Sequence, residues 1–220
     1  MEEGADPASV AFDAVTRGVE TGVDAEIAQG KSLIAAATQA AIPYLVFSSV
    51  ADANRNTGVP HFDSKYEVEQ LLAATDIPHT VVGPTYFYDN LLGSADALAA
   101  GVMPIAMPAD KPLQQTARAD LGRFVAHLFA DPTAYVGQRI DIASDDPTPE
   151  AMATTLSTVL DRPVQAESYD PERISSEDMR AMFTFLSTEG YSVDIPELHR
   201  RFPDVGWQSF ADWAEQSLPR

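Results

Sequence analysis

The order of elements between residues 44 and 92 constrains the fold more than any other part of the chain. The apolar run Tyr44–Val50 is rich in β-branched and aromatic residues and predicts a buried strand. A second such run covers His79–Gly83, and a helix carrying Lys65 separates the two. Strand, helix and strand in units of this length predict a parallel sheet. Because parallel α/β sheets bind ligands beyond the carboxyl ends of their strands, polar residues that follow these runs are the first candidates for a site.

The rest of the chain continues this alternation. The pattern Ser64-x-x-Glu67 predicts a capping box at the start of the Lys65 helix, and Pro60 offers an alternative start one turn earlier. From Val164 onward we expect a mostly helical lobe that ends in an aromatic cluster of Phe202, Trp207, Phe210 and Trp213. The other expected elements are strands over Val10–Thr16 and residues 138–143, and helices over residues 24–41, 119–130 and 149–160.

Composition narrows the classes of partner. The chain has 220 residues, of which 45% are hydrophobic, so a globular protein with a sizeable core is expected. A net charge of -19 argues against nucleic acid and anionic membranes as partners. No cysteine is present and the four histidines lack metal-ligand spacing, so we expect no metal site and a cytoplasmic protein.

The basic residues are skewed toward arginine. Three lysines stand against eleven arginines, and alanine is abundant. An acidic, lysine-poor surface is typical of salt-adapted proteins, because strong screening removes the repulsion among many carboxylates. A genome of high GC content, which favours arginine and alanine codons, explains the same composition. The sequence leaves both explanations open.

Several ordered motifs carry a family resemblance. The motifs are Glu26-x-x-Gln29-Gly30-Lys31, Leu45-Val46-Phe47-Ser48-Ser49, His61-Phe62-Asp63-Ser64-Lys65-x-x-x-Glu69 and Pro84-x-x-Phe87-x-Asp89-Asn90. With these motifs the chain resembles, over nearly its whole length, the NmrA-like family, whose members are atypical short-chain dehydrogenases. This resemblance implies a Rossmann-like parallel sheet over residues 1–147, with a small, mostly helical lobe over residues 148–220 interleaved with it. It also implies binding of NAD or NADP.

One family feature does not occur in the printed sequence. Family members open with a strand and a glycine-rich turn that binds pyrophosphate, and no Gly-x-x-Gly-x-x-Gly or Gly-x-Gly-x-x-Gly pattern is found here. The first residues resemble the loop before the family's fourth strand, so we expect a Rossmann-like sheet without its first βαβ units. Dinucleotide binding would then be weak. The strand Val10–Thr16 would be an open edge, through which a homo-oligomer is expected to form.

The resemblance also assigns roles to residues beside the carboxyl ends of the strands. Lys65 would hold the ribose, and His61 stands where the superfamily has a proton-donating tyrosine. Ser48 occupies the position of the catalytic serine or threonine, and Ser49 and Thr16 would contact the cofactor. Other interpretations need no ligand: Lys65 as a solvated first-turn residue, His61 as a loop histidine, and the hydroxyls as partners of strand-end backbone groups.

An aromatic turn completes the expected site. The family uses the segment after the second strand to cover the nicotinamide side of the pocket. Here that segment consists of Pro84, Phe87, Tyr88, Asp89 and Asn90. The alternative is an ordinary packed loop between a strand and a helix.

Two functions follow from these residues. The first is an NAD(P)-binding protein that either reduces a small carbonyl or quinone or senses redox state. The second is a family member that binds no dinucleotide and serves as an interaction module or a degenerate fragment.

Overall fold

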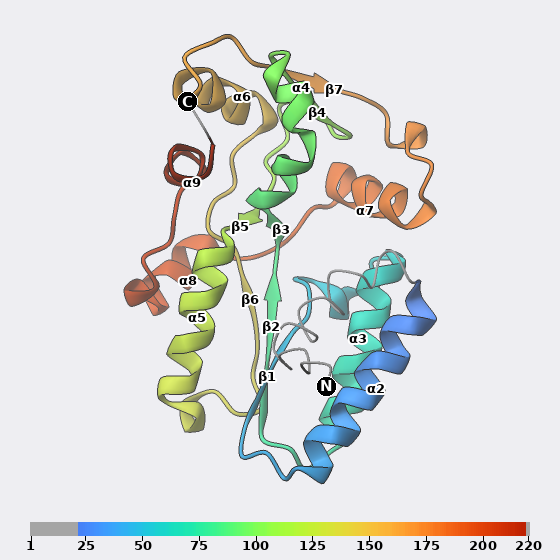
Figure 1. Ribbon diagram of the computed structural model, residues 1–220. Helices are drawn as coiled ribbons and strands as arrows, with labels where there is room; N and C mark the ends of the chain where they lie inside the picture. Colours follow the sequence, from blue (N-terminus) through green and yellow to red (C-terminus); the bar gives the residue numbers. More distant parts are fainter. Residues whose placement is uncertain (1–21, 219–220) are drawn as a thin grey trace, which may run out of the picture.

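A three-stranded parallel sheet lies at the centre of the computed structural model, which describes residues 22–218 (Figure 1). The strands β1 (Leu45–Ser48), β2 (His79–Pro84) and β6 (Arg139–Ile142) lie in the order β1–β2–β6. Both pairings are parallel, so the carboxyl ends of the three strands meet at one edge of the sheet. This confirms the parallel α/β architecture. The expected strand Val10–Thr16 lies outside the described residues.

Helices cover both faces of this sheet. Helices α2 (Val23–Gln39) and α3 (Pro60–Ala73) lie on one side, and α5 (Arg118–Ala130) lies on the other (Figure 1). Gly30 lets α2 approach α3 closely, because a Cβ atom at this position would lie 2.5 Å from Val68 Cγ2. On the α5 side, apolar residues of β2 and β6 pack against buried residues of α5.

Helix α3 begins at Pro60, one turn before the predicted capping box. The fixed φ of proline suits the first helical position, so the alternative start is the correct one. Ser64 therefore lies inside the helix, and its hydroxyl donates to Glu26 on α2 instead of capping a helix end. The N-cap residue Val59 has no side-chain acceptor to offer. The exposed amides of the first turn need a partner from another element.

A second lobe covers the carboxyl edge of the sheet, in the upper half of Figure 1. It contains a parallel strand pair, β4 (Val102–Ile105) and β7 (Gln165–Ser168). The chain after residue 164 is mostly helical, as expected, and β7 is the one strand among its described elements. The largely exposed residues of β7 show no strand periodicity. Because β4 precedes residue 148 and β7 follows it, the lobe draws on both sides of the expected boundary. Its helices are α4 (Ala95–Ala99), α6 (Pro149–Val159), α7 (Glu177–Thr188) and α9 (Phe210–Ser217).

The C-terminal aromatic residues form two clusters instead of one. Phe202 packs against Phe124 of α5 at a ring-centroid distance of 4.9 Å, and Trp207 joins this cluster. Phe210 and Trp213 lie in the core of the second lobe. Within the first cluster, the chain turns between Phe202 and Trp207 at Gly206, whose φ of 65° is a left-handed conformation that glycine adopts without strain.

Shorter elements connect these parts. Strands β3 (Tyr86–Phe87) and β5 (Gln115–Thr116) pair in parallel between the two lobes. Within residues 22–218, no helix combines the length and hydrophobicity needed to cross a bilayer. The remaining elements are η1 (Ala53–Arg55), η2 (Tyr88–Ser94), η3 (Pro132–Ala134), η4 (Pro171–Arg173), α8 (Ile195–Arg201) and η5 (Pro203–Val205).

Candidate functional site

The two serines at the end of β1 have different surroundings. Ser49 is buried, and its hydroxyl donates a hydrogen bond to the carboxylate of Glu69 on α3. The Ser49 hydroxyl therefore has a structural role, because its hydrogen is already donated within the protein. Ser48 is only half-buried, and none of the hydrogen bonds within residues 22–218 involves its hydroxyl. Of the two, Ser48 is the one that can serve a ligand. Thr16, the third predicted hydroxyl, lies outside the described residues.

Lys65 lies in the second turn of α3 and forms an ion pair with Glu26 of α2. Both side chains are largely buried, with exposed fractions of 13% and 11%. Glu26 also accepts a hydrogen bond of 2.5 Å from Ser64. The ammonium group is therefore held in one place by a neighbouring helix, and the interpretation of Lys65 as a freely solvated residue is wrong.

His61 lies one turn before Lys65 and contacts the second lobe. Its Nδ1 lies 2.7 Å from Asp178 Oδ1 on α7, and the same oxygen accepts the backbone N–H of His61 at 2.9 Å. Asp178 thus supplies the partner that the first turn of α3 needs, where the helix dipole also favours a negative charge. Burial works to raise the pKa of Asp178, but hydrogen bonds and charge from His61, aided by the charge of Lys65, hold that pKa below its usual value.

No sequence pattern pointed to Asp178. It stands in the acidic first turn of α7, where a carboxylate is explained by the helix dipole alone. It is 117 residues away from His61 in the chain, so only the packing of α7 on α3 brings the two together. The motif predicted His61 and Lys65, and the structure adds Glu26 and Asp178 as their partners.

A buried polar network lies deeper, at the same end of the sheet. Arg139 of β6 donates to Glu69 Oε2 at 2.9 Å, to the Val50 carbonyl at 2.7 Å, and also to Asp141. The second carboxylate oxygen of Asp141 accepts the backbone N–H of Asp52 at 3.1 Å. Burial raises the pKa of Asp141, although Arg139 opposes this effect. The network joins β6 and the segment that follows β1 to α3, and it was not predicted.

The aromatic turn is split between the surface and the core. Tyr88 is fully buried among residues of the second lobe, and its ring lies 5.4 Å from that of Phe210. The prediction that Tyr88 lines the pocket was wrong, because the lobe packs around this side chain. Pro84 is likewise buried, at the end of β2.

The other residues of this turn remain accessible. Phe87 lies under the guanidinium of Arg118, 5.9 Å from the ring centre, and Asp89 lies 3.7 Å from the same group. Asn90 is exposed, and burial raises the pKa of the neighbouring Tyr86 to about 12. This surface can accept a ring or a polar group of a ligand.

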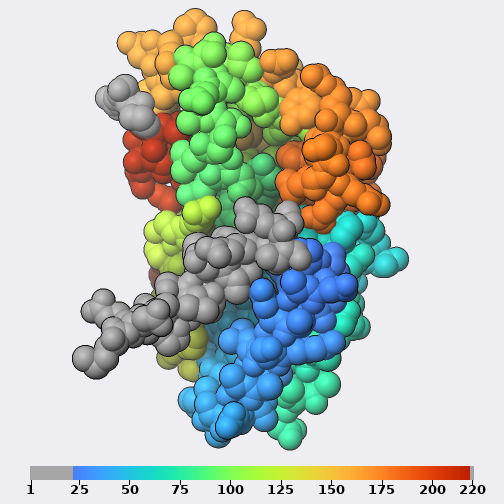
Figure 2. All heavy atoms as spheres, turned by 45° about the vertical axis from the view of Figure 1, so that its right-hand side comes forward, coloured from blue at the N-terminus to red at the C-terminus, as the bar shows by residue number. Residues whose placement is uncertain are grey.

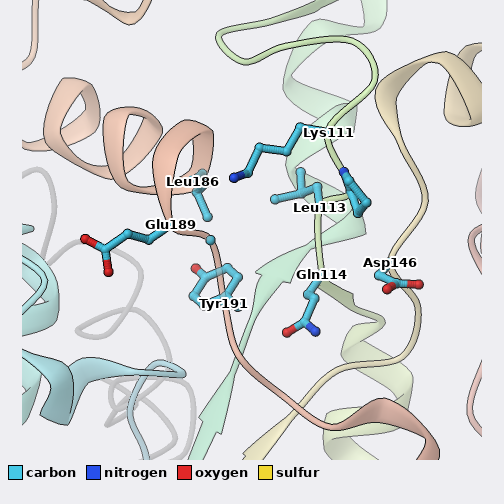
Figure 3. A pocket seen from close by; sticks show the side chains of 9 residues that line it. Lys111, Leu113, Gln114, Asp146, Leu186, Glu189 and Tyr191 are labelled. Atoms are coloured by element: carbon cyan, nitrogen blue, oxygen red, sulfur yellow. The ribbon is translucent and has the colours of Figure 1, made fainter.

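A pocket of about 230 Å³ lies between α7 and the loop at residues 111–114 (Figure 3). Lys111, Asp146 and Glu189 supply its charges, and Tyr191 stands in its wall. His61 and Lys65 do not line it. Tyr191 stacks on Phe62, which follows His61 in α3, so the pocket reaches the neighbourhood of the α3 start.

Comparison with known proteins identifies the family of the chain. The model of the NmrA-like family matches residues 2–213. The chain belongs to the NmrA-like family. The fold is shared with several solved NmrA-type structures, which cover 86–89% of this chain at 17–20% identity.

Three of these structures illustrate the range of the fold. A triphenylmethane reductase of Citrobacter sp., complexed with NADP(H), has a TM-score of 0.75 at 17% identity, with 89% of this chain and 72% of that chain covered. An NADPH-dependent quinone oxidoreductase of Escherichia coli, complexed with NADPH, has a TM-score of 0.72 at 20% identity, with 86% and 70% covered. NmrA, a negative transcriptional regulator in complex with NAD, has a TM-score of 0.66 at 20% identity, with 88% and 70% covered.

Proposed function

We propose that this NmrA-like protein binds a nicotinamide dinucleotide, NAD or NADP, and uses it to reduce a small carbonyl or quinone compound or to sense redox state. The observation that carries this proposal is the Lys65 ammonium held by Glu26 beside the carboxyl edge of the sheet. The family match over residues 2–213 supports it further and favours it over a role as a simple interaction module.

The residues present fit one end of such a cofactor. A fixed ammonium can donate hydrogen bonds to the hydroxyls of a ribose, and the Ser48 hydroxyl is uncommitted within the described residues. The accessible side chains of the aromatic turn offer an apolar face with polar groups around it, as small-molecule sites generally do. The printed sequence contains no glycine-rich phosphate turn. The residues present therefore fit the nicotinamide and its ribose.

Each residue has a role that follows from its chemistry. A bound reduced dinucleotide would supply the hydride. Lys65 would bind the ribose, and Glu26 would keep its ammonium in place. Ser48 would donate a hydrogen bond to the oxygen of the substrate, which gains negative charge during reduction. Phe87 would shield one side of the site from water.

Titration of NADPH and NADH against the purified chain tests this proposal through nicotinamide fluorescence. We expect saturable binding by at least one of them, with a Kd above about 1 µM, because helix-terminus contacts to phosphate contribute much of dinucleotide affinity. Binding of neither compound at millimolar concentration would contradict the proposal. Sub-micromolar binding would instead contradict the expectation that phosphate contacts are weak here.

A further inference from the structure

The contact between Asp178 and His61 has the geometry of a pair that holds an imidazole ring in one orientation. Asp178 Oδ1 lies 2.7 Å from the ring Nδ1 of His61, and it accepts a hydrogen bond of 2.9 Å from the backbone N–H of the same residue. The ring also packs edge-on against Phe62, with centroids 4.7 Å apart. Exposed fractions of 12% for His61 and 21% for Asp178 keep the pair largely out of water.

The protonation state of Asp178 decides which ring nitrogen carries hydrogen. Asp178 lies near two basic groups, His61 and Lys65, and stays ionised because its pKa is held below the usual value. An ionised carboxylate can only accept hydrogen bonds. The hydrogen of a neutral His61 ring therefore sits on Nδ1, which leaves Nε2 as the atom that can exchange a proton.

We propose that Asp178 is a positioning residue that holds His61 with Nδ1 protonated, so that Nε2 gives the proton in the reduction. This rests on the proposed function. In that step the carbonyl carbon accepts hydride from the reduced dinucleotide, and the C=O electron pair moves to oxygen. The oxygen then bonds to the proton from Nε2 of the imidazolium, and the electron pair of the broken N–H bond stays on Nε2. The carbonyl becomes a hydroxyl, the dinucleotide is oxidised, and His61 regains its proton from water.

This arrangement makes the second lobe part of the site. Asp178 belongs to α7, while His61 and Lys65 belong to α3 (Figure 1). The other oxygen of Asp178 is buried, and no group within residues 22–218 donates to it. In the Ser-His-Asp triad, too, a carboxylate orients a histidine ring and stabilises its charged form.

Nitrogen NMR on the full chain tests the positioning directly. The chain has four histidines, and His61→Phe identifies the signals of His61 by their loss. In mildly alkaline buffer we expect wild-type His61 to carry hydrogen on Nδ1. Asp178→Ala should move it toward the Nε2–H form, whereas Asp178→Asn, which retains an acceptor oxygen, should preserve the Nδ1–H form. Glu177→Gln, a loss of charge on the same turn of α7, is the matched control. An Nε2–H ring in the wild type, or no change in Asp178→Ala, would overturn the proposal.

A kinetic measurement separates positioning from a purely structural role. With NADPH and 9,10-phenanthrenequinone as the probe, Asp178→Ala should lower kcat about 100-fold, because a misplaced His61 no longer acts as the general acid, and leave NADPH affinity unchanged. Asp178→Asn should retain part of the activity, and Glu177→Gln all of it. A wild-type kcat in Asp178→Ala would contradict the proposal. If the wild type does not reduce the quinone, the NMR result decides. Failure to bind NADPH would count against the proposed function and would leave the His61 result standing.

Discussion

At the scale of single residues, Gly83 in β2 is under the tightest steric constraint. A Cβ atom there would collide with Asp141 Oδ1 and lie 3.0 Å from the backbone nitrogen of Ala51. Asp141 cannot swing aside, because Arg139 and the Asp52 amide hold its carboxylate. We expect Gly83→Ala to lower the free energy of unfolding by about 2 kcal/mol, as overpacking does.

Gly122 gives the matched control for this prediction. It lies inside α5, and a Cβ atom there would meet no atom within 4 Å. Gly122→Ala should therefore raise the free energy of unfolding by about 1 kcal/mol, through helix propensity alone. Urea unfolding of both variants measures the two changes. Equal effects of the same sign would show that Gly83 is not sterically restricted.

Residues of the site differ in how far they could be predicted. His61, Lys65 and Ser48 follow local patterns, since a helix start or a strand end can be located from neighbouring residues. Asp178 could not be predicted, because its role depends on a contact between distant segments. Tyr88 was misassigned for a related reason. An aromatic residue after a strand serves equally well in a pocket or a core, and the lobe that buries it comes from later residues.

At the scale of elements, Arg139 links the sheet to α3. Its exposed fraction is 19%, and its partner Glu69 is 6% exposed. Removing the cation would leave the buried carboxylate of Glu69 and the partly buried carboxylate of Asp141 without their charged partner. Breaking a buried pair in this way typically costs about 3–5 kcal/mol, so we expect Arg139→Met to lower the free energy of unfolding by that amount.

The exposed pair of Arg200 and Glu197 on α8 provides the comparison. Its side chains are 73% and 52% exposed. Exposed pairs contribute little, so Arg200→Met should leave the unfolding midpoint unchanged within error. Chemical unfolding measures both variants. If Arg139→Met were as harmless as Arg200→Met, the buried network would have no part in stability.

The elements themselves were largely predictable where periodicity was strong. The strands β1, β2 and β6 and the helices α2, α5 and α6 lie within a few residues of their predicted bounds. The start of α3 was predicted only as an alternative, because Ser64-x-x-Glu67 also fits a capping box. Strand β7 has a single apolar residue, Ala166, and no alternation, and only its pairing with β4 makes it a strand. Non-local pairing of this kind leaves no local signal.

At the scale of the whole molecule, the net charge of -19 should make stability depend on salt. Repulsion among carboxylates weakens the compact state at low ionic strength, and salt screens it. We expect the melting temperature to rise from low to molar KCl. Parallel measurements in a sulfate salt separate screening from the general effect of excluded salts. A flat response in KCl would leave genome composition as the explanation for the shortage of lysine.

In the proposed function, Lys65, held by Glu26, binds the ribose of a nicotinamide dinucleotide. Fluorescence titration of NADPH against Lys65→Ala, Lys31→Ala and His61→Phe tests this role. Lys31 is the matched control, because it lies on α2, is 57% exposed and pairs only loosely with Glu67 at 3.8 Å. We predict that Lys65→Ala abolishes measurable binding, while Lys31→Ala and His61→Phe keep the wild-type affinity. Wild-type affinity in Lys65→Ala, or a greater loss in His61→Phe, would contradict the account.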